Sequence, residues 1–289
     1  MSQLLDGKIL AQKIKDSLKA EVRALQQKTG RVPHLVNVMI GSDPSACAYA
    51  NSQEKTAEYI GIEYHLKTLS PNISEKDLIV EIERLNKDQN VNGIMIHKPV
   101  PAHINYRAVA NHVDIRKDLE GINVANIGKM IVGETKIIPC TPAAVMEHLK
   151  TTGVSLRGKE TVIVGHSEIV GKPLSLLLLA EYATVTVCHI ATSEAGKLQD
   201  HLSHADIVIV AVGKTNFIKG EWIKKGAIVI DVGINQVKDM IVGDVEFQTA
   251  KDKASFITPV PGGVGPVTVV MLMRNGIEAF KVQILKDKN

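Results

Sequence analysis

Short apolar segments alternate with amphipathic helical segments along this chain, and that alternation most constrains its fold. In the first half, Gly30 can end the first helix, and Ser74 with Asp77 forms a capping box for a later one. We expect helices over about 9–25, 45–60 and 74–87, with strands over about 34–40, 62–68 and 93–96. Strands separated by helices pair in parallel and are covered on both faces, which predicts an α/β fold.

The alternation starts again near Pro139 and continues to the end of the chain. Thr141 can cap a helix with Pro142 at its first position, and a further helix opens near Val170. We expect strands over about 161–164, 184–188, 206–212 and 227–232, and a last helix over about 266–285. The predicted domain boundary lies between Asn123 and Pro139, so the sequence indicates two α/β domains.

Composition excludes several classes of protein. The 289 residues carry a net charge of +3 and only 3% aromatic residues, which argues against a nucleic-acid partner. No apolar run approaches the roughly 20 residues that span a bilayer, and the polar start is not a signal peptide. Cys47, Cys140 and Cys188 are too few and too scattered for a disulfide framework or a zinc site. We therefore expect a cytoplasmic protein with no metal and no membrane partner.

A glycine- and proline-rich segment spans residues 259–268. Proline fixes φ and glycine opens backbone geometries closed to other residues, so the segment predicts a rigid, sharply turning loop. Its small side chains would let its amides lie against a flat ligand. A plain connection between a strand and the helix that follows is the alternative.

A second glycine turn follows the expected strand 161–164. Gly165 and Gly171 flank a strand-to-helix turn, and the amides of a helix N-terminus can hold a pyrophosphate. The spacing is not Gly-x-Gly-x-x-Gly, so a plain turn remains an alternative. Many NAD enzymes carry an acid at the end of the next strand. Here that strand ends at Cys188-His189-Ile190, which leaves the cofactor preference open.

These segments, taken together, resemble a known family. The similarity runs from Leu5 to the final helix and is carried by residues 139–142, 164–173, 183–189, 219–224, 230–235 and 257–268. The chain resembles the bifunctional methylenetetrahydrofolate dehydrogenase/methenyltetrahydrofolate cyclohydrolase family. The resemblance implies a catalytic, folate-binding domain over 1–138 plus a C-terminal helix at about 268–289. It also implies a Rossmann-type NAD(P)-binding domain over 139–267, an active site in the cleft between the domains, and a homodimer.

The resemblance also implies binding residues. For the folate side these are Lys98, Pro261, Gly262, Gly263, Val264, Gly265, Pro266 and Thr268. For the cofactor they are Gly165, His166, Ser167, Ile190 and Ile234. His166 replaces the arginine, and Ile190 the serine, that usually bind the 2′-phosphate of NADP. The cofactor is therefore NAD or NADP, and the lost phosphate contacts favour NAD although no acid selects it.

The implied catalytic residues depart from the family pattern. Tyr49 matches, but Gln53 occupies the position of a lysine credited with acid/base work in opening the methenyl ring. Residues four apart share a helix face, whereas Lys55 lies on roughly the opposite face and should not substitute. Glutamine can position a substrate by hydrogen bonds but cannot exchange protons as a desolvated lysine does.

Further positions around the same pocket also differ. His97 replaces the glutamine that partners the lysine, and histidine or the adjacent Lys98 could take over proton transfer. Glu120 replaces an aspartate that contacts the pterin ring, which moves the carboxylate outward by one methylene. The leading hypothesis is a methylenetetrahydrofolate dehydrogenase with weak or lost cyclohydrolase activity. The alternatives are a bifunctional enzyme, a non-catalytic folate- or nucleotide-binding paralogue, and a dehydrogenase for a modified one-carbon carrier.

Overall fold

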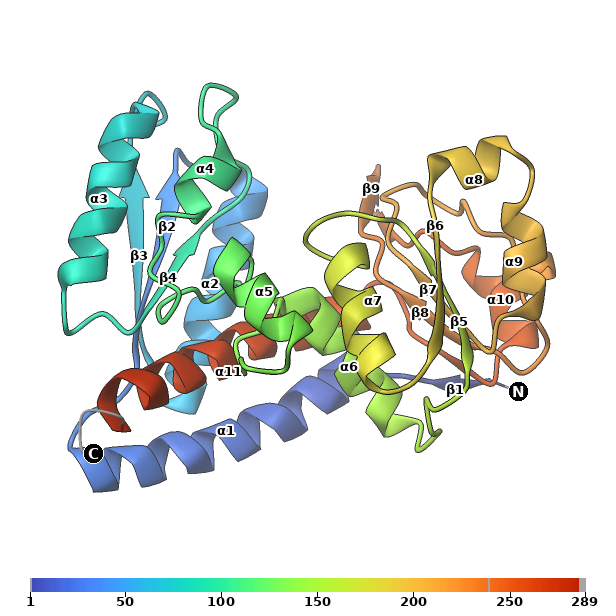
Figure 1. The fold of residues 1–289 in the computed structure, drawn as a ribbon, viewed down its shortest axis with the longest axis horizontal. Coiled ribbons are helices and arrows are strands. Elements are labelled where there is room, and N and C mark those ends of the chain that lie inside the picture. The colour runs from blue at the N-terminus through green and yellow to red at the C-terminus, as the bar shows by residue number, and fades with distance from the viewer. Residues whose placement is uncertain (1, 239, 286–289) are drawn as a thin grey trace. The chain divides into compact units, whose positions relative to one another are not determined.

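The computed structural model describes residues 2–238 and 240–285 of the chain (Figure 1). Its contacts divide into two compact units. The large-sheet unit comprises the chain up to Ala11 together with Thr141–Thr268, and the small-sheet unit comprises Gln12–Cys140 and the chain from Val269 onward. These contact units are a different division from the functional domains expected from the sequence, whose bounds stay a prediction.

The small-sheet unit has three parallel strands, with β2 (His34–Ile40) between β3 (Glu63–Leu69) and β4 (Gly93–Ile96). Helices α2 (Pro44–Ile60) and α3 (Glu75–Lys87) flank this sheet (Figure 1). Val36 and Val38 of β2 share a core cluster with Leu78 and Ile82 of α3. Because successive side chains of a strand point to opposite faces, Asn37 between the two valines points away from α3. The short helices are α4 (Tyr106–Ala110) and α5 (Val124–Ile131).

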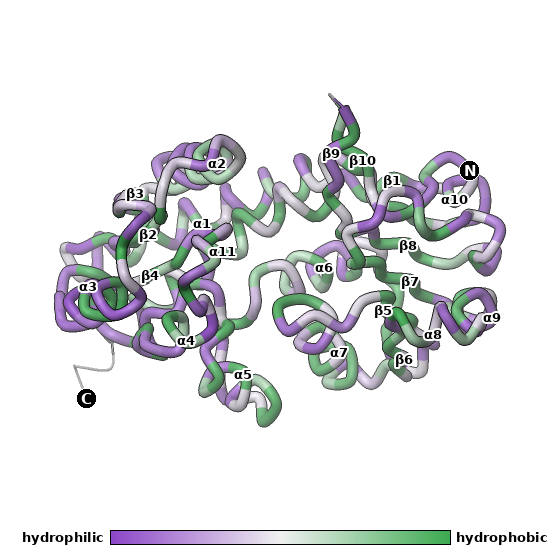
Figure 2. Tube along the Cα trace, turned by 90° about the horizontal axis from the view of Figure 1, so that it is seen from above, coloured by the Kyte–Doolittle hydropathy of each residue, from purple (hydrophilic) through white to green (hydrophobic). Residues whose placement is uncertain are grey.

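The large-sheet unit contains a six-stranded parallel sheet in the order β1-β11-β8-β7-β5-β6. The strand order reverses at β5, which lies between β6 and β7, and such a switch point is where ligands bind in open α/β sheets. The inner strands are almost wholly buried. They are also mostly apolar, as the hydropathy colouring in Figure 2 shows. The strands are β1 (Gln3–Leu4), β5 (Glu160–Val164), β6 (Thr184–Cys188), β7 (Ile207–Val210), β8 (Ile228–Asp231) and β11 (Phe256–Ile257). An antiparallel hairpin joins β9 (Asn235–Val237) and β10 (Met240–Val242).

Helices cover the large sheet. Leu202 of α9 and Ala250 of α10 join Val162, Val208 and Val229 in one core cluster. The helices are α6 (Cys140–Thr151), α7 (Gly171–Ala180), α8 (Ile190–Glu194), α9 (Leu198–His204), α10 (Phe247–Lys253) and the 3₁₀ turn η1 (Gly220–Trp222). Two long helices, α1 (Gly7–Thr29) and α11 (Val264–Leu285), each begin in this unit and continue into the small-sheet unit.

The predicted strands and helices are present, but two helix starts were placed wrongly. Helix α6 begins at Cys140, so Thr141 lies inside the helix instead of capping it. Helix α11 begins at Val264, two residues before the expected Pro266. In both cases a proline lies in the first turn, where a missing N–H breaks no helical hydrogen bond, so its position does not mark the start closely. No helix in the described part of the chain is long and apolar enough to cross a membrane.

Candidate functional site

A buried polar cluster lies between β2 and α2 in the small-sheet unit. Gln53 of α2 is 0% exposed, and its Oε1 accepts hydrogen bonds of 2.8 Å from both Asn37 Nδ2 and Tyr64 OH. Asn37 Nδ2 also lies 3.0 Å from Nδ1 of His97, the residue that follows β4. One network thus joins side chains from β2, β3, α2 and the end of β4. We call it the Asn37 cluster (Asn37, Gln53, Tyr64 and His97).

Tyr49 joins the Asn37 cluster through its ring. The rings of Tyr49 and His97 meet edge to face with centroids 5.7 Å apart. Burial raises the pKa of Tyr49 and lowers that of His97, so both groups are held in their neutral forms near pH 7. Lys55 is exposed on the other side of α2, as the helical spacing predicts. The structure therefore brings Tyr49, Gln53 and His97 together and leaves Lys55 outside.

Glu120 is held by a tyrosine that the sequence did not single out. Tyr106 OH donates a 2.7 Å hydrogen bond to Glu120 Oε2, and Lys98 Nζ lies 3.8 Å from the centroid of the Tyr106 ring. Burial raises the pKa of Glu120 to about 7, against the opposing effects of the Tyr106 hydrogen bond and the Lys98 charge. Glu120 therefore changes its charge within the physiological range.

Hydrogen bonds and close packing hold the loop that carries Glu120. Asp118 is buried and accepts hydrogen bonds from the backbone N–H groups of Glu120, Gly121 and Asn123. Asn275 of α11 donates to the carbonyl oxygens of Leu119 and Ile138, both at 2.8 Å. Gly121 has φ +66° and packs so closely on Ile138 that an added Cβ would lie 2.5 Å from the Ile138 carbonyl carbon. These contacts fix the backbone from which the Glu120 side chain projects.

The glycine-rich loop lines a pocket of about 270 Å³ in the large-sheet unit. Gly7 approaches it so closely that a Cβ there would lie 1.7 Å from the Gly263 carbonyl oxygen. Ile234, expected on the cofactor side, lines the same pocket, whereas Thr268 does not. The lining residues are Lys8, Asp231–Ile234, Ile241 and Pro259–Pro266. The loop is thus the wall of a largely apolar hollow as well as the start of α11.

The Gly165 turn lies at the switch point between β5 and β7. A Cβ on Gly165 would lie 2.3 Å from the Ala211 carbonyl oxygen, and one on Gly171 would lie 2.0 Å from the Gly165 carbonyl oxygen. No side chain caps α7, whose N-terminus follows this turn. Buried Asp244 holds the facing loop by accepting from the N–H groups of Val212, Gly213 and Lys214. A close-packed glycine turn that leads into a helix fits a pyrophosphate-bearing cofactor. At the start of α7, however, Lys172 N already donates to the Ser167 carbonyl oxygen, and Pro173 has no N–H.

The end of the turn that would meet an adenosine ribose carries histidines and an isoleucine. The ring centroids of His166 and His189 are 5.3 Å apart, and the Ile190 side chain is 73% exposed. Ser167 Oγ accepts a hydrogen bond from Val170 N and so shapes the turn. Neither arginine nor lysine occupies the positions of His166 and Ile190, where the resemblance implies phosphate contacts.

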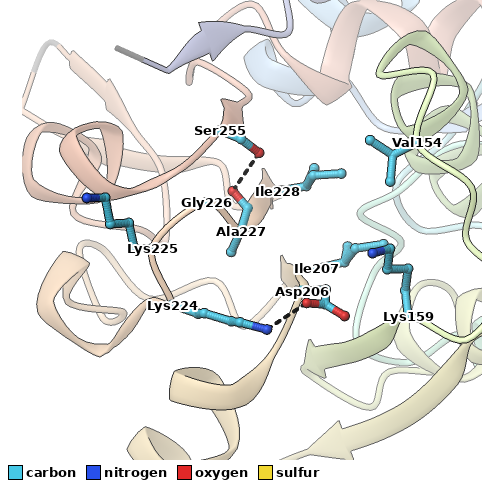
Figure 3. Close-up of a pocket in the computed structure, with 10 residues that line it drawn as sticks. All are labelled: Val154, Lys159, Asp206, Ile207, Lys224, Lys225, Gly226, Ala227, Ile228 and Ser255. Carbon is cyan, nitrogen blue, oxygen red and sulfur yellow. Dashed lines mark hydrogen bonds and ion pairs between the residues drawn. The ribbon is translucent and has the colours of Figure 1, made fainter.

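A second cavity of about 210 Å³ opens at the amino ends of β7 and β8, opposite the switch point. It contains Lys159, Lys224 and Lys225, but Lys224 is paired with Asp206 at 2.7 Å. Figure 3 shows that Lys225 and Lys159 lie on opposite sides of this cavity and do not converge. None of the predicted site residues lines it, so it is not the candidate site. Among the described residues no group of three or more His, Cys, Asp or Glu side chains could hold a metal ion.

Sequence reasoning missed Asn37, Tyr64, Tyr106 and Asn275. Asn37 carried a signal, because it interrupts an otherwise apolar run in a buried strand. The two tyrosines carried none, since they reach Gln53 and Glu120 only through the tertiary fold.

Known proteins resemble the chain over almost its whole length. Residues 5–120 match the catalytic domain, and residues 139–284 the NAD(P)-binding domain, of tetrahydrofolate dehydrogenase/cyclohydrolase. The bifunctional protein FolD of Acetivibrio thermocellus is 47% identical over 98% of both chains. The crystal structure of the bifunctional FolD methylenetetrahydrofolate dehydrogenase/cyclohydrolase from Campylobacter jejuni superposes with a TM-score of 0.94 at 40% identity, covering 98% of this chain and 99% of that one. A Trypanosoma brucei FolD structure complexed with NADP and an inhibitor gives a TM-score of 0.93 at 37% identity, covering 97% and 98%. The chain belongs to the tetrahydrofolate dehydrogenase/cyclohydrolase family.

Proposed function

We propose that this protein oxidises 5,10-methylenetetrahydrofolate by hydride transfer to a nicotinamide cofactor, and that its cyclohydrolase activity is weak or absent. One observation carries the second part. Gln53, at the position of the family's catalytic lysine, is fully buried and its amide oxygen is occupied by Asn37 and Tyr64. An amide does not titrate near neutral pH and cannot relay protons.

Oxidation of the substrate needs no such relay. The C–H bond of the one-carbon bridge breaks, the hydride leaves with both electrons, and the methenyl cation remains, so no proton enters or leaves. A nicotinamide cofactor, when bound, would supply the acceptor for that hydride. The protein's task is then to bind and align the substrate. We assign the pterin contact to Glu120, folate-side binding to Lys98 and the wall of the folate pocket to residues 261–266 and 268. We also propose that Tyr49 packs or hydrogen-bonds near the reacting carbon and that Gln53 and His97 position the substrate.

Ring opening of the methenyl product does need proton transfer. Water adds to the methenyl carbon and its oxygen loses both protons in turn, while the ring nitrogen gains one proton as its bond to that carbon breaks, so that one proton is released overall. Gln53 cannot serve, and Lys55 is exposed on another face of α2. Lys98 is directed over the Tyr106 ring, where its charge also opposes the raised pKa of Glu120. The loss of the lysine therefore affects hydrolysis far more than oxidation.

A second candidate function is favoured by the place of His97. Its ring contacts Tyr49 and belongs to the Asn37 cluster, so it lies where the family's lysine and glutamine would act. If His97 or Lys98 replaces the lysine, the protein is bifunctional. A hydrolysis rate that follows a histidine titration and disappears in His97→Ala would identify this case.

We further propose a preference for NAD over NADP. A 2′-phosphate gains most from an arginine fork, and the implied contact positions hold His166 and Ile190. The resemblance also supports a cytoplasmic homodimer, with a folate domain over 1–138 plus 268–289 and an NAD(P) domain over 139–267. Sedimentation equilibrium of the full chain tests the dimer.

A paired assay on the purified protein tests the proposed function. One reaction follows methylenetetrahydrofolate oxidation with NAD and with NADP, and the other follows methenyltetrahydrofolate hydrolysis. We expect oxidation without appreciable hydrolysis. Turnover in both reactions would favour the bifunctional enzyme. Ligand binding without turnover in either reaction would overturn the proposal in favour of a binding paralogue or a modified carrier.

A further inference from the structure

Asn37 is an unusual residue at its position. It lies in the centre of β2, where residues 35, 36 and 38–40 are apolar and buried, and it is itself 1% exposed. Burying an amide is unfavourable unless it is hydrogen-bonded. Its Nδ2 has three acceptors within reach, Gln53 Oε1 at 2.8 Å, Tyr64 OH at 2.8 Å and His97 Nδ1 at 3.0 Å. The amide therefore joins α2, β3 and the end of β4 at one point.

The donors of this network bear on the state of His97, because the two hydrogens of Asn37 Nδ2 face three acceptors, whereas Asn37 Oδ1 is buried without a hydrogen-bond partner. The amide nitrogen of Asn37 can only donate, so His97 Nδ1 must present a lone pair to it. Tyr64 OH donates its own proton to Gln53 Oε1 at 2.8 Å, and that oxygen of Tyr64 is then free to accept from Asn37. Burial disfavours the imidazolium as well. A neutral His97 with a bare Nδ1 carries its proton on Nε2.

The tautomer of His97 follows from the orientation of the Asn37 and Gln53 amides. Gln53 Nε2 lies 3.6 Å from Met95 Sδ, a weak acceptor, and its Oε1 receives two donors. Turning Asn37 alone would place its oxygen 2.8 Å from Gln53 Oε1, where two acceptors repel each other. Turning both amides together would let Asn37 Oδ1 accept from an Nδ1–H of His97, which is the tautomer that would overturn the proposal below. The titratable groups near His97 are Tyr49 and Tyr64, whose pKa values are raised by burial, that of Tyr64 to about 12, and Asp43, whose charge opposes the lowered pKa of His97.

We propose that Asn37 is a positioning residue that holds His97 as a neutral imidazole protonated on Nε2, so that His97 donates a hydrogen bond and does not accept a proton there. Provided that the chain is the dehydrogenase proposed above, this makes the Asn37 cluster a proton-inert support for the substrate. It also gives a physical reason why His97 does not replace the missing lysine.

Nitrogen-15 NMR of histidine-labelled protein tests the tautomer directly. His97→Gln identifies the His97 signals by their loss. We expect Nε2–H coupling and a bare Nδ1 at pH 7, and the neutral form should persist below pH 6.5, the ordinary histidine pKa. An Nδ1–H tautomer or an imidazolium at pH 7 in the unmodified protein would overturn the proposal, whatever happens to any variant.

Two variants separate positioning from simple packing. Asn37→Asp puts a carboxylate before Nδ1, so the tautomer should invert to Nδ1–H and the His97 titration should rise by roughly 1–3 pH units. Asn37→Leu should leave a mixture of tautomers and lower kcat for oxidation, with the KM for the cofactor unchanged. An unchanged His97 spectrum in both variants would refute the role of Asn37.

Asn92→Leu is the matched control. Asn92 is equally buried in the same unit, where its side chain accepts from His34 N and lies 3.4 Å from Gln283 Oε1. This control should lose stability as Asn37→Leu does but keep the His97 spectrum of the unmodified protein. Vigorous hydrolysis with the expected tautomer would contradict the proposed function alone, whereas absent hydrolysis with an Nδ1–H tautomer would contradict only the role of Asn37.

Discussion

Tyr106 donates a 2.7 Å hydrogen bond to Glu120, and the same tyrosine ring lies under the ammonium group of Lys98 at 3.8 Å. The donor side of this bond matters, because a hydrogen bond given to a carboxylate favours its ionised form. Burial acts in the opposite direction and is the stronger effect, since the pKa of Glu120 is raised from 4.5 to about 7. Glu120 is therefore a pH-sensitive part of the proposed pterin site.

We predict that kcat/KM for methylenetetrahydrofolate rises with pH through about pH 7. Glu120 is neutral below its pKa of about 7 and ionised above it, and the proposed pterin contact needs the carboxylate. The rate constant should fall by about tenfold per pH unit well below the pKa and level off above it. The Glu120→Gln variant should have a lower kcat/KM that does not rise with pH through this range. The same rise in Glu120→Gln would assign the titration to another group.

Tyr106→Phe should shift the rise in kcat/KM to higher pH. The variant removes the hydrogen bond that favours the Glu120 carboxylate and leaves the buried surroundings in place. The pKa of Glu120 should rise, so the midpoint of the kcat/KM profile should shift to higher pH while the plateau changes less. A midpoint that stays at the same pH, or moves down, would show that Tyr106 does not control the ionisation of Glu120.

Gln53→Lys should restore methenyltetrahydrofolate hydrolysis in part. A lysine at this fully buried position has its pKa lowered by burial, so its amine can exchange protons near pH 7. General acid/base catalysis contributes roughly 10²–10⁴-fold, and we expect a gain of at least about tenfold in the single variant. Gln53→Met keeps the length and the burial but cannot titrate, and it should show no gain. Hydrolysis by both variants, or by neither, would contradict the role assigned to this position.

His166→Arg combined with Ile190→Ser should shift the cofactor preference toward NADP. The arginine supplies a charge-assisted fork for a 2′-phosphate and the serine a hydroxyl, both at the end of the Gly165 turn. Hydrogen bonds to charged groups contribute about 1.5–3 kcal/mol, so kcat/KM with NADP should rise by roughly 10- to 100-fold relative to NAD. Steady-state assays with both cofactors measure the ratio, and Ile190→Ser alone should change it much less. An unchanged ratio in the double variant would place the phosphate elsewhere.

Much of this fold could be predicted from the sequence because its strands are short, apolar and bounded by helices. The strand 184–188 and the strand 34–40 begin and end where the pattern predicts. Helix starts were less predictable, since Pro142 and Pro266 are tolerated anywhere in a first turn. The family and the two-domain α/β fold are confirmed by the comparisons, whereas the roles of the site residues remain predictions.

The polar environment of the site could not be read from spacing alone. Helical periodicity places Tyr49 and Gln53 on one face, but it does not show that Gln53 is bonded to Asn37 and Tyr64 from two strands. Nor does the motif around Glu120 show that Tyr106, fourteen residues earlier, holds its carboxylate. Such contacts depend on strand register and on which face a side chain occupies, and both are set by the whole sheet.

Gly93→Ala should destabilise the small-sheet unit and weaken folate binding together. A Cβ at Gly93 would lie 2.2 Å from Leu119 Cδ2 and 2.9 Å from Leu35 Cδ2, so the side chains of β2 and of the Glu120 loop would have to shift. Overpacking of this kind costs about 1–3 kcal/mol. Because Leu119 precedes Glu120, we also expect a higher KM for the folate substrate and an unchanged KM for the cofactor.

Gly128→Ala is the control, since nothing lies within 4 Å of its added Cβ, and an alanine in α5 should stabilise the helix by about 0.5–1 kcal/mol. Thermal unfolding and steady-state kinetics of the two variants measure both effects. A destabilised Gly93→Ala protein with an unaltered folate KM would separate the packing of Leu119 from the position of Glu120.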